Sequence, residues 1–470
     1  MLFNSIEFLL FFLIVTTVFF VLPHRFRWIH LLLASCVFYC AFIPAYILIL
    51  FFTIVIDYLA GIWIEGAGNA ATKKRYLTLS IIANLSVLFF FKYFNFFTEN
   101  INEVLLSLGL GVEPFPYLNI ILPIGLSFHT FQAMSYTIEV YRGNQKAERH
   151  LGLYSLYVMF YPQLVAGPIE RPQNILPQFK TPKKLVASEV FAGLHQITWG
   201  LFKKVVVADQ FAIYCNSIYN NWELNTGLTL VLATYAFAIQ IYGDFSGYSD
   251  IAQGSARVMG FKLMDNFNLP YFSKSVTEFW RRWHMSLSSW LRDYLYISLG
   301  GNRISKTRTK INLFLTMTLG GLWHGASWNF AIWGLLNGAY LSAEKAMGIG
   351  SPKKWYTKIF AAFATFNLIC LTWVFFRAST FEQATGILKN ILFASHFWTV
   401  RIQDTGIFAS MIFGLTTMLL IEFTWLRKTS AWQFFTVKNW FKSLFWILTL
   451  VIIIILFGVS GGDQFIYFQF

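Results

Sequence analysis

An ionisable side chain lies in the middle of a long apolar stretch of this sequence. His324 lies within the apolar residues 311–341, directly after Trp323 and four residues before Trp328, which Asn329 follows. Polar groups at membrane depth are costly and are therefore usually functional, and a neutral imidazole in a dry pocket can take a proton from a hydroxyl near neutral pH. The two indoles could shape a slot for a flat or apolar group. A structural histidine bonded to a backbone carbonyl would look the same, so both interpretations stay open.

A second polar cluster lies in an aromatic run. The run from Trp280 to His284 contains Arg281 and Arg282, within residues 277–299, which are too polar to face lipid all round. On a helix, His284 would share one face with Trp280. Another face would carry Arg281, Met285, Ser288 and Arg292. Guanidinium groups bind phosphates through two parallel hydrogen bonds, so the cluster could hold an anionic substrate. The alternative is an interfacial anchor of snorkelling arginines and belt tryptophans.

A third group ends an apolar stretch. Gln240, Asp244 and Tyr248 are spaced four apart, so a helix would place them on one face. Asp244 and Asp250 could orient a histidine or bind a sugar hydroxyl. A polar helix end without a further role explains these residues nearly as well.

A fourth group lies within the apolar residues 118–141. His129 and Gln132 could line a channel there. Hydrogen bonding inside a helix bundle is the alternative, and we favour it slightly.

Other chemistries have little support. The sequence contains no HExxH, GxSxG or P-loop motif and no cysteine pair at zinc spacing. The four cysteines, which are Cys36, Cys40, Cys215 and Cys370, fit core packing. We therefore expect neither a metal site nor a disulfide framework. Broken helices with buried polar groups also occur in transporters, so a transporter stays an alternative.

The composition defines the class of protein. The 470 residues are 56% hydrophobic and only 12% charged, against about 25% charged residues in soluble domains. This predicts an all-α polytopic membrane protein with one membrane domain over residues 1–470. The net charge of +14 lies in short loops between apolar spans, which is typical of cytoplasmic loops facing anionic lipid rather than of nucleic-acid binding.

Apolar stretches and basic loops predict the spans, each about 20 residues long. We expect spans at residues 3–22, 28–64 (two), 77–97, 118–141, 228–242, 358–376, 407–426 and 444–459. The apolar residues 151–165 end at a Gly-Pro break, where Glu170 and Arg171 indicate a re-entrant turn or an interfacial loop. The first is a retained span rather than a signal peptide, because it lacks a basic leader and a cleavage site. Basic residues at 24–27, 73–75, 142–149, 303–310 and 427–442 mark the cytoplasmic side, so both chain ends lie outside.

Three segments are less regular. Residues 311–341 are long for one span and short for two, and their glycines predict two pieces that meet near His324 in a broken hairpin at membrane depth. Residues 186–209, with Lys203 and Lys204, are expected to form an amphipathic helix at the cytoplasmic interface. Residues 381–393 are expected to form a short amphipathic helix outside.

Four ordered motifs carry a resemblance that runs through the whole chain. They are residues 166–172 (AGPIERP), 244–250 (DFSGYSD), 279–288 (FWRRWHMSLS) and 322–325 (LWHG), followed by the closing residues 465–470 (FIYFQF). In these motifs the sequence resembles the membrane-bound O-acyltransferase family, in particular its bacterial branch. The resemblance implies a ring of about eleven transmembrane helices, with re-entrant and interfacial helices and a thinned centre.

The resemblance also implies a reaction. His324 matches the histidine taken as catalytic, and His284 matches a second histidine that lines the substrate path. Members of the branch move an acetyl group from cytoplasmic acetyl-CoA toward hydroxyls of an exported polysaccharide such as alginate, often with a periplasmic acetyltransferase as partner. We accordingly expect a multi-pass protein of the bacterial inner membrane, with acetyl-CoA as donor and no bound cofactor.

Further residues receive roles on the same basis. Arg281, Arg282 and Arg303 would hold the coenzyme A phosphates. Asp244 and Tyr248 would position groups in the funnel, beside Trp280 and Asn329 as further substrate contacts. The alternatives are an acetyl-donor subunit for peptidoglycan, an enzyme with a protein or lipid acceptor, and a transporter without chemistry of its own.

Overall fold

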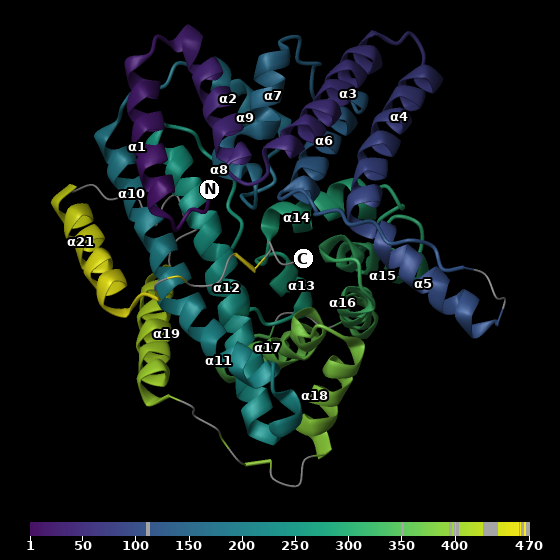
Figure 1. The fold of residues 1–470 in the computed structure, drawn as a ribbon, viewed down its shortest axis with the longest axis vertical. Helices are drawn as coiled ribbons and strands as arrows, with labels where there is room; N and C mark the ends of the chain where they lie inside the picture. Colours follow the sequence, from purple (N-terminus) through teal and green to yellow (C-terminus); the bar gives the residue numbers. More distant parts are fainter. Residues whose placement is uncertain are drawn as a thin grey trace. The chain divides into compact units, whose positions relative to one another are not determined.

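Helices form all the regular structure that the computed structural model describes. It describes residues 1–109, 113–348, 352–393, 397–398, 400, 404–425, 440–459, 461 and 465–466. These ranges contain no strand (Figure 1), so the expected all-α fold is confirmed. Arg427, Lys428 and Lys438 of the expected basic loop and residues 467–470 of the closing motif lie outside the described residues.

The helices follow one another along the whole chain. The α-helices are α1 (Ile6–Val21), α2 (His24–Cys40), α3 (Ile47–Gly66), α4 (Ala70–Leu88), α5 (Phe94–Ser107), α6 (Leu126–Tyr141), α7 (Leu151–Met159), α8 (Tyr161–Leu164), α9 (Pro172–Lys180), α10 (Ala187–Leu201), α11 (Asp209–Tyr219), α12 (Gly227–Val258), α13 (Val276–Trp280), α14 (Met285–Trp290), α15 (Lys306–His324), α16 (Trp328–Met347), α17 (Trp355–Arg377), α18 (Phe381–Phe393), α19 (Thr405–Trp425) and α21 (Trp440–Phe457). Three 3-10 turns are η1 (Pro44–Tyr46), η4 (Trp222–Leu224) and η5 (Pro270–Phe272), and three π-helical segments are η2 (Phe89–Tyr93), η3 (Phe202–Ala208) and η6 (Leu291–Tyr296).

Six of the described helices are long and apolar enough to cross a membrane. They are Pro44–Gly66, Ala70–Ser107, Gly227–Val258, Trp355–Arg377, Thr405–Thr424 and Trp440–Phe457. Helix α1 is apolar but shorter. The chain is therefore a multi-pass membrane protein. The expected ring of about eleven spans stays a prediction.

Contacts divide the chain into two compact units. The first consists of Met1, residues 10–184 and residues 325–327, and the second of residues 2–9, 185–324 and 328–470. The expectation of a single membrane domain stays a prediction. Each unit is described by itself below.

In the first unit, α3 packs against α4 and α6, and a buried polar cluster joins the three helices. The Asp57 carboxylate accepts hydrogen bonds from Ser80 Oγ at 2.5 Å and from Asn84 Nδ2 at 2.9 Å. Ser80 Oγ also lies 3.2 Å from Thr137 Oγ1. Bonds of this kind hold helices together in lipid, where burial of apolar area adds little between helices.

The fourth polar group of the sequence also belongs to this bundle. His129 Nε2 lies 2.5 Å from Thr53 Oγ1, and Gln132 Nε2 donates to the carbonyl of Tyr157. Both side chains are buried. Hydrogen bonding inside a bundle, the interpretation that we favoured, is confirmed, and the channel lining is not supported.

Two apolar stretches of the first unit, the expected span at residues 118–141 and residues 151–165, are broken. Helix α6 begins at Leu126 rather than at residue 118, because Gly125 at its start has the left-handed φ of +77°. Helix α7 ends at Met159, and Pro162 in the next turn has no N–H to continue it. Residues 118–141 and 151–165 are therefore not continuous helices. The expected turn between α2 and α3 near Pro44 is confirmed.

In the second unit, the long helix α12 packs along α10 and α11 (Figure 1). The polar residues 243–254, at which the expected span ended, continue this helix without a break. Glycines let α10 and α12 approach closely: a Cβ on Gly200 would lie 2.5 Å from the carbonyl oxygen of Gly247, and one on Gly254 would lie 2.6 Å from that of Gly193. Small residues of this kind are how membrane helices pack at short range.

The close α10–α12 packing encloses two lysines. Lys203 and Lys204 are 1% and 6% exposed. Lys203 Nζ lies 2.5 Å from Asp250 Oδ2, and Lys204 Nζ lies 2.9 Å from Asp209 Oδ1 and from Asp244 Oδ1. The amphipathic pattern suggested that the two lysines face the membrane surface, but they do not, because buried carboxylates neutralise both ammonium groups. The interfacial position of residues 186–209 stays a prediction.

The broken hairpin around His324 is confirmed. Helix α15 ends at His324, and α16 begins at Trp328. Gly320 and Gly321 were expected to break the helix because of their residue type, but α15 continues through both. Gly321 instead brings the two helices together, since a Cβ there would lie 2.3 Å from the carbonyl oxygen of Phe330.

Candidate active site

His324 is buried in an aromatic surrounding at the carboxyl end of α15. Its side chain is 9% exposed. The imidazole meets the edge of the Trp333 ring at 5.1 Å between centroids and the Phe376 ring at 5.5 Å. A histidine placed in this way can accept a proton while its neighbours exclude water.

His284 does not lie on a continuous helix. The chain breaks between α13 and α14, and His284 occupies the left-handed region with φ +44°. The predicted helical face shared by Trp280 and His284 was therefore wrong. The ring is 1% exposed, contacts Phe245 at 4.6 Å, and places Nδ1 3.1 Å from Asn266 Oδ1.

Aromatic contacts connect the two histidine segments. Trp283, next to His284, packs 5.2 Å from Trp373, and Trp373 stacks on Trp333 at 5.8 Å. Trp333 in turn contacts His324. Burial lowers the pKa of His284, which lies outside the spanning helices, well below its usual value, and the charge of His324 lowers it further. The ring contacts of Trp283, Trp373 and Trp333 therefore place both histidine segments in one region of the second unit.

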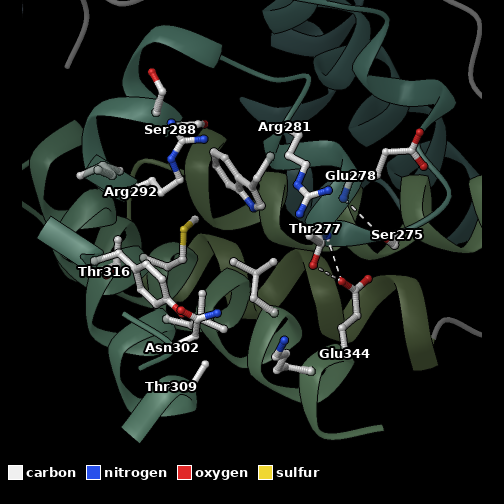
Figure 2. A pocket seen from close by; sticks show the side chains of 18 of the residues that line it. Ser275, Thr277, Glu278, Arg281, Ser288, Arg292, Asn302, Thr309, Thr316 and Glu344 are labelled. Carbon is white, nitrogen blue, oxygen red and sulfur yellow. Dashed lines mark hydrogen bonds between the residues drawn. The ribbon is translucent and has the colours of Figure 1, made fainter. Parts of the chain in front are cut away.

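A large cavity of about 1190 Å³ lies in the same unit. Figure 2 shows Arg281 and Arg292 along one side of it and Asn302, Thr309 and Glu344 along the other. Its other polar and charged lining side chains include Lys274, Ser275, Thr277, Glu278, Ser288, Thr316 and Lys345. Four cations against two carboxylates give the cavity a positive balance.

The cavity adjoins the surroundings of His324. Trp280 lines its wall, donates from Nε1 to Asn337 Oδ1 at 3.3 Å, and contacts the Trp333 ring at 5.6 Å. Met317 also lines it and lies about two turns before His324 on the same face of α15. The single ring of Trp333 therefore touches both the wall residue Trp280 and His324.

The four residues expected on the second helical face lie on either side of the break between α13 and α14, and all of them line the cavity. They are Arg281, Met285, Ser288 and Arg292. Arg292 Nε pairs with Asp293 at 2.8 Å. Arg282 is directed elsewhere: its guanidinium pairs with Glu278 at 2.7 Å, and it is not among the described residues that line the cavity.

Asp244 and Tyr248 have packing and ion-pair contacts. Asp244 Oδ2 accepts a hydrogen bond from the Ile466 N–H at 2.6 Å, in addition to its pair with Lys204. The Tyr248 ring stacks between Phe3 at 4.4 Å and Phe465 at 4.5 Å. Within the described residues, neither lines the large cavity. Their predicted role in substrate positioning stays a prediction.

Asn329 ties two helices together near the hairpin. It is 4% exposed, and its Nδ2 donates to the carbonyl of Ala378 at 2.9 Å. The contact fixes the start of α16 against the end of α17. A substrate contact of Asn329 stays a prediction.

Two residues that sequence reasoning missed shape the site. The Glu344 carboxylate caps α13 by accepting the N–H groups of Val276 at 2.6 Å and Thr277 at 2.9 Å, and Figure 2 shows it reaching Thr277. Asn266 bonds the ring of His284. Neither residue has a local signal, because each acts on a segment that is distant in the sequence.

Comparisons with known proteins identify the relatives of this chain. Residues 67–381 match the MBOAT, membrane-bound O-acyltransferase family. The chain is 42% identical over 393 residues to a probable alginate O-acetylase AlgI of Pseudomonas aeruginosa, covering 82% of this chain and 73% of that protein. It is 41% identical over 423 residues to the Azotobacter vinelandii protein of the same name, with 89% and 83% covered. It is 35% identical over 485 residues to a peptidoglycan O-acetyltransferase of Helicobacter pylori, with 94% and 91% covered.

The chain therefore belongs to the membrane-bound O-acyltransferase family. It is an acyltransferase with several membrane-spanning helices. The resemblance drawn from the sequence motifs is confirmed, whereas the roles of individual residues stay predictions.

Proposed function

We propose that this acyltransferase moves an acetyl group from acetyl-CoA, on the cytoplasmic side of a bacterial inner membrane, to hydroxyls of an exported polysaccharide. Two kinds of relative support the acetyl group and a cell-surface polymer, since their names specify alginate or peptidoglycan O-acetylation. The identities of about 41% to the alginate relatives favour an alginate-like polymer over peptidoglycan.

The cavity beside His324 is the observation that carries the proposal. Its volume of about 1190 Å³ exceeds the usual range of about 300–1,000 Å³ for small-molecule sites, as a donor of the size of acetyl-CoA requires. Arg281, Arg292, Lys274 and Lys345 line it and suit the coenzyme A phosphates. The Trp280–Trp333 contact at its inner wall leads to His324.

The reaction needs one base and balances without a bound cofactor. The acceptor hydroxyl attacks the thioester carbonyl, and His324 takes the hydroxyl proton as the new C–O bond forms. The C–S bond then breaks, and the coenzyme A thiolate receives the proton from His324. The products are the acetyl ester and free coenzyme A. A periplasmic partner protein would receive the acetyl group first if its own hydroxyl is the direct acceptor.

The His324→Ala variant tests the role of the base. In a deletion strain complemented with the variant, ester-linked acetyl on the exported polymer should fall by about 10²-fold or more, the usual contribution of a general base. His150→Ala is the control, because His150 is exposed and lies in the first unit, where it precedes α7 and accepts the Leu153 N–H. Equal membrane levels and equal thermal unfolding temperatures show that both variants fold. Near-normal polymer acetylation in the His324 variant contradicts the proposal.

A second measurement separates an enzyme from a transporter. The purified chain in lipid nanodiscs is given labelled acetyl-CoA and either alginate oligosaccharides or peptidoglycan fragments. Base-labile label on the alginate fragments is expected. Label on the peptidoglycan fragments would assign peptidoglycan as the acceptor polymer. The proposal of an enzyme that uses acetyl-CoA is contradicted if the purified chain neither transfers nor hydrolyses the labelled donor, with or without its periplasmic partner.

A further inference from the structure

We infer that Asn266 is a positioning residue that holds the His284 imidazole in the tautomer with the proton on Nδ1, so that Nε2 carries the lone pair. Asn266 lies outside the sequence motifs from which the site was predicted. The kinetic consequence rests on the proposed acyl transfer, whereas the tautomer itself can be measured without any substrate.

A backbone donor fixes the orientation of the Asn266 amide. The Ser286 N–H lies 3.3 Å from Asn266 Oδ1, and Ser286 Oγ lies 2.8 Å from the same atom. Because a backbone N–H can only donate, its partner must be the amide oxygen and not the NH₂ group. The NH₂ group in turn donates to Ser249 Oγ at 3.1 Å. Both ends of the amide are thus assigned without reference to the histidine.

The oriented amide decides which ring nitrogen of His284 is protonated. Nδ1 lies 3.1 Å from Asn266 Oδ1, and an amide oxygen offers only lone pairs. A hydrogen bond between these two atoms therefore needs a proton on Nδ1, since two facing lone pairs would repel each other. Ser286 Oγ also lies 3.4 Å from Nδ1, but its hydroxyl donates to the nearer Asn266 Oδ1 at 2.8 Å. Burial lowers the pKa of His284 and keeps the ring neutral at physiological pH. In the neutral ring, a proton on Nδ1 leaves Nε2 as the acceptor.

The backbone around Asn266 holds both sides of His284. The Asn266 carbonyl accepts the Met285 N–H at 2.9 Å, and the Asn268 N–H donates to the Arg282 carbonyl at 2.9 Å. Between these two bonds, His284 adopts a left-handed conformation, which is unfavourable for a residue with a Cβ. Asn266 is itself 1% exposed. The loop therefore fixes the position of the ring as well as its proton.

Charged groups near this pair come from several elements. Lys203 from η3 and Asp250 from α12 form an ion pair and line, with Asp265 and Asn266, a cavity of about 10 Å³, which is about enough for one water. His324 from α15 acts on the His284 ring. The neutral amide of Asn266 orients the imidazole without raising its basicity, as a carboxylate in its place would.

The tautomer determines what His284 can do beside His324. With its lone pair on Nε2, His284 would accept a hydrogen bond from a hydroxyl that approaches this atom. Under the proposed acyl transfer, this bond would orient the acceptor hydroxyl for His324. The opposite tautomer would present an N–H and leave the hydroxyl without this partner. Loss of Asn266 should therefore lower kcat rather than weaken donor binding.

Nitrogen NMR of the resting protein tests the tautomer directly. The full chain, labelled with ¹⁵N-histidine in lipid nanodiscs, is compared with its His284→Gln variant, and the difference identifies the two His284 ring signals. A protonated Nδ1 and an unprotonated Nε2 are expected at neutral pH. A proton on Nε2 overturns the inference, whatever the substrate of the enzyme proves to be.

Kinetics test the consequence. Asn266→Ala should lower kcat for acetyl transfer by about 10²-fold, at an unchanged KM for acetyl-CoA. Asn266→Asp keeps the acceptor oxygen, so it should keep the tautomer and most of the activity, with the acidic limb of the pH–rate profile moved to higher pH by its negative charge. Asn225→Ala is the matched control, because Asn225 is also buried in a loop and donates to a backbone carbonyl, that of Asn221. An Asn266→Ala variant that retains full kcat, or one no more impaired than the Asn225 control, overturns the positioning role.

Discussion

Two neighbouring glycines of α15 offer a matched test of how the hairpin positions His324. Gly321 faces α16, and a Cβ added there would lie 2.3 Å from the Phe330 carbonyl oxygen and 2.8 Å from the Gly334 Cα. Both neighbours are backbone atoms, so they cannot turn away. Gly320, one residue earlier, would place its Cβ 3.1 Å from Leu291 Cδ1, which is the end of a flexible side chain.

The expected effects of alanine differ in sign. Both substitutions gain about 1 kcal/mol of helix propensity. At Gly321 the helices must separate by about 1 Å to restore an ordinary contact, and overpacking of this kind costs about 1–3 kcal/mol. Gly321→Ala should therefore unfold at a lower temperature than the parent protein, whereas Gly320→Ala should unfold at an equal or higher one.

The separation of α15 from α16 should displace His324 and lower the rate of acetyl transfer, because His324 lies one turn after Gly321 at the end of the same helix. A shift of about 1 Å in a catalytic group can cost about 10²-fold in rate. Acetyl transfer and thermal unfolding are measured for both variants in the same detergent or nanodisc. If both variants lose activity and stability equally, or neither does, the tight α15–α16 contact does not position His324.

Two further perturbations follow from the charged side chains. Arg281→Ala should raise the KM for acetyl-CoA several-fold with little change in kcat and weaken the dependence of this KM on salt, because Arg281 lines the cavity as a phosphate-binding cation. The Arg282 guanidinium pairs with Glu278, so Arg282→Ala should change the KM less. Equal effects of the two substitutions would contradict the assignment of Arg281 to phosphate binding. Lys203→Met should destabilise the protein by about 3–5 kcal/mol, because it leaves the buried Asp250 carboxylate without its counter-ion. Adding Asp250→Asn should restore part of this loss in thermal unfolding, and a double variant no more stable than the single one would show that the pair is not coupled.

The sequence by itself determined the class of protein and the position of the hairpin. Hydropathy, basic loops and proline or glycine breaks act over a few residues, so they predicted the all-helical membrane fold, the turn at Pro44 and the end of α15 at His324. Motif resemblance added the family, which the comparisons confirm. It also directed attention to His324 and His284, which the fold brings into one region of the second unit.

The tertiary structure decided the partners of Lys203, Lys204 and His284, which no local sequence pattern predicts. Lys203 and Lys204 looked like interfacial cations, but carboxylates on α11 and α12 draw them into the protein interior. A continuous helix was expected through His284, but the Asn266 loop breaks it there and orients the ring. The partners Asp244, Asp250 and Asn266 are distant in the sequence from the residues that they bind. They meet these residues only after folding, because an ion pair or a hydrogen bond acts through space and leaves no periodic signal along the chain.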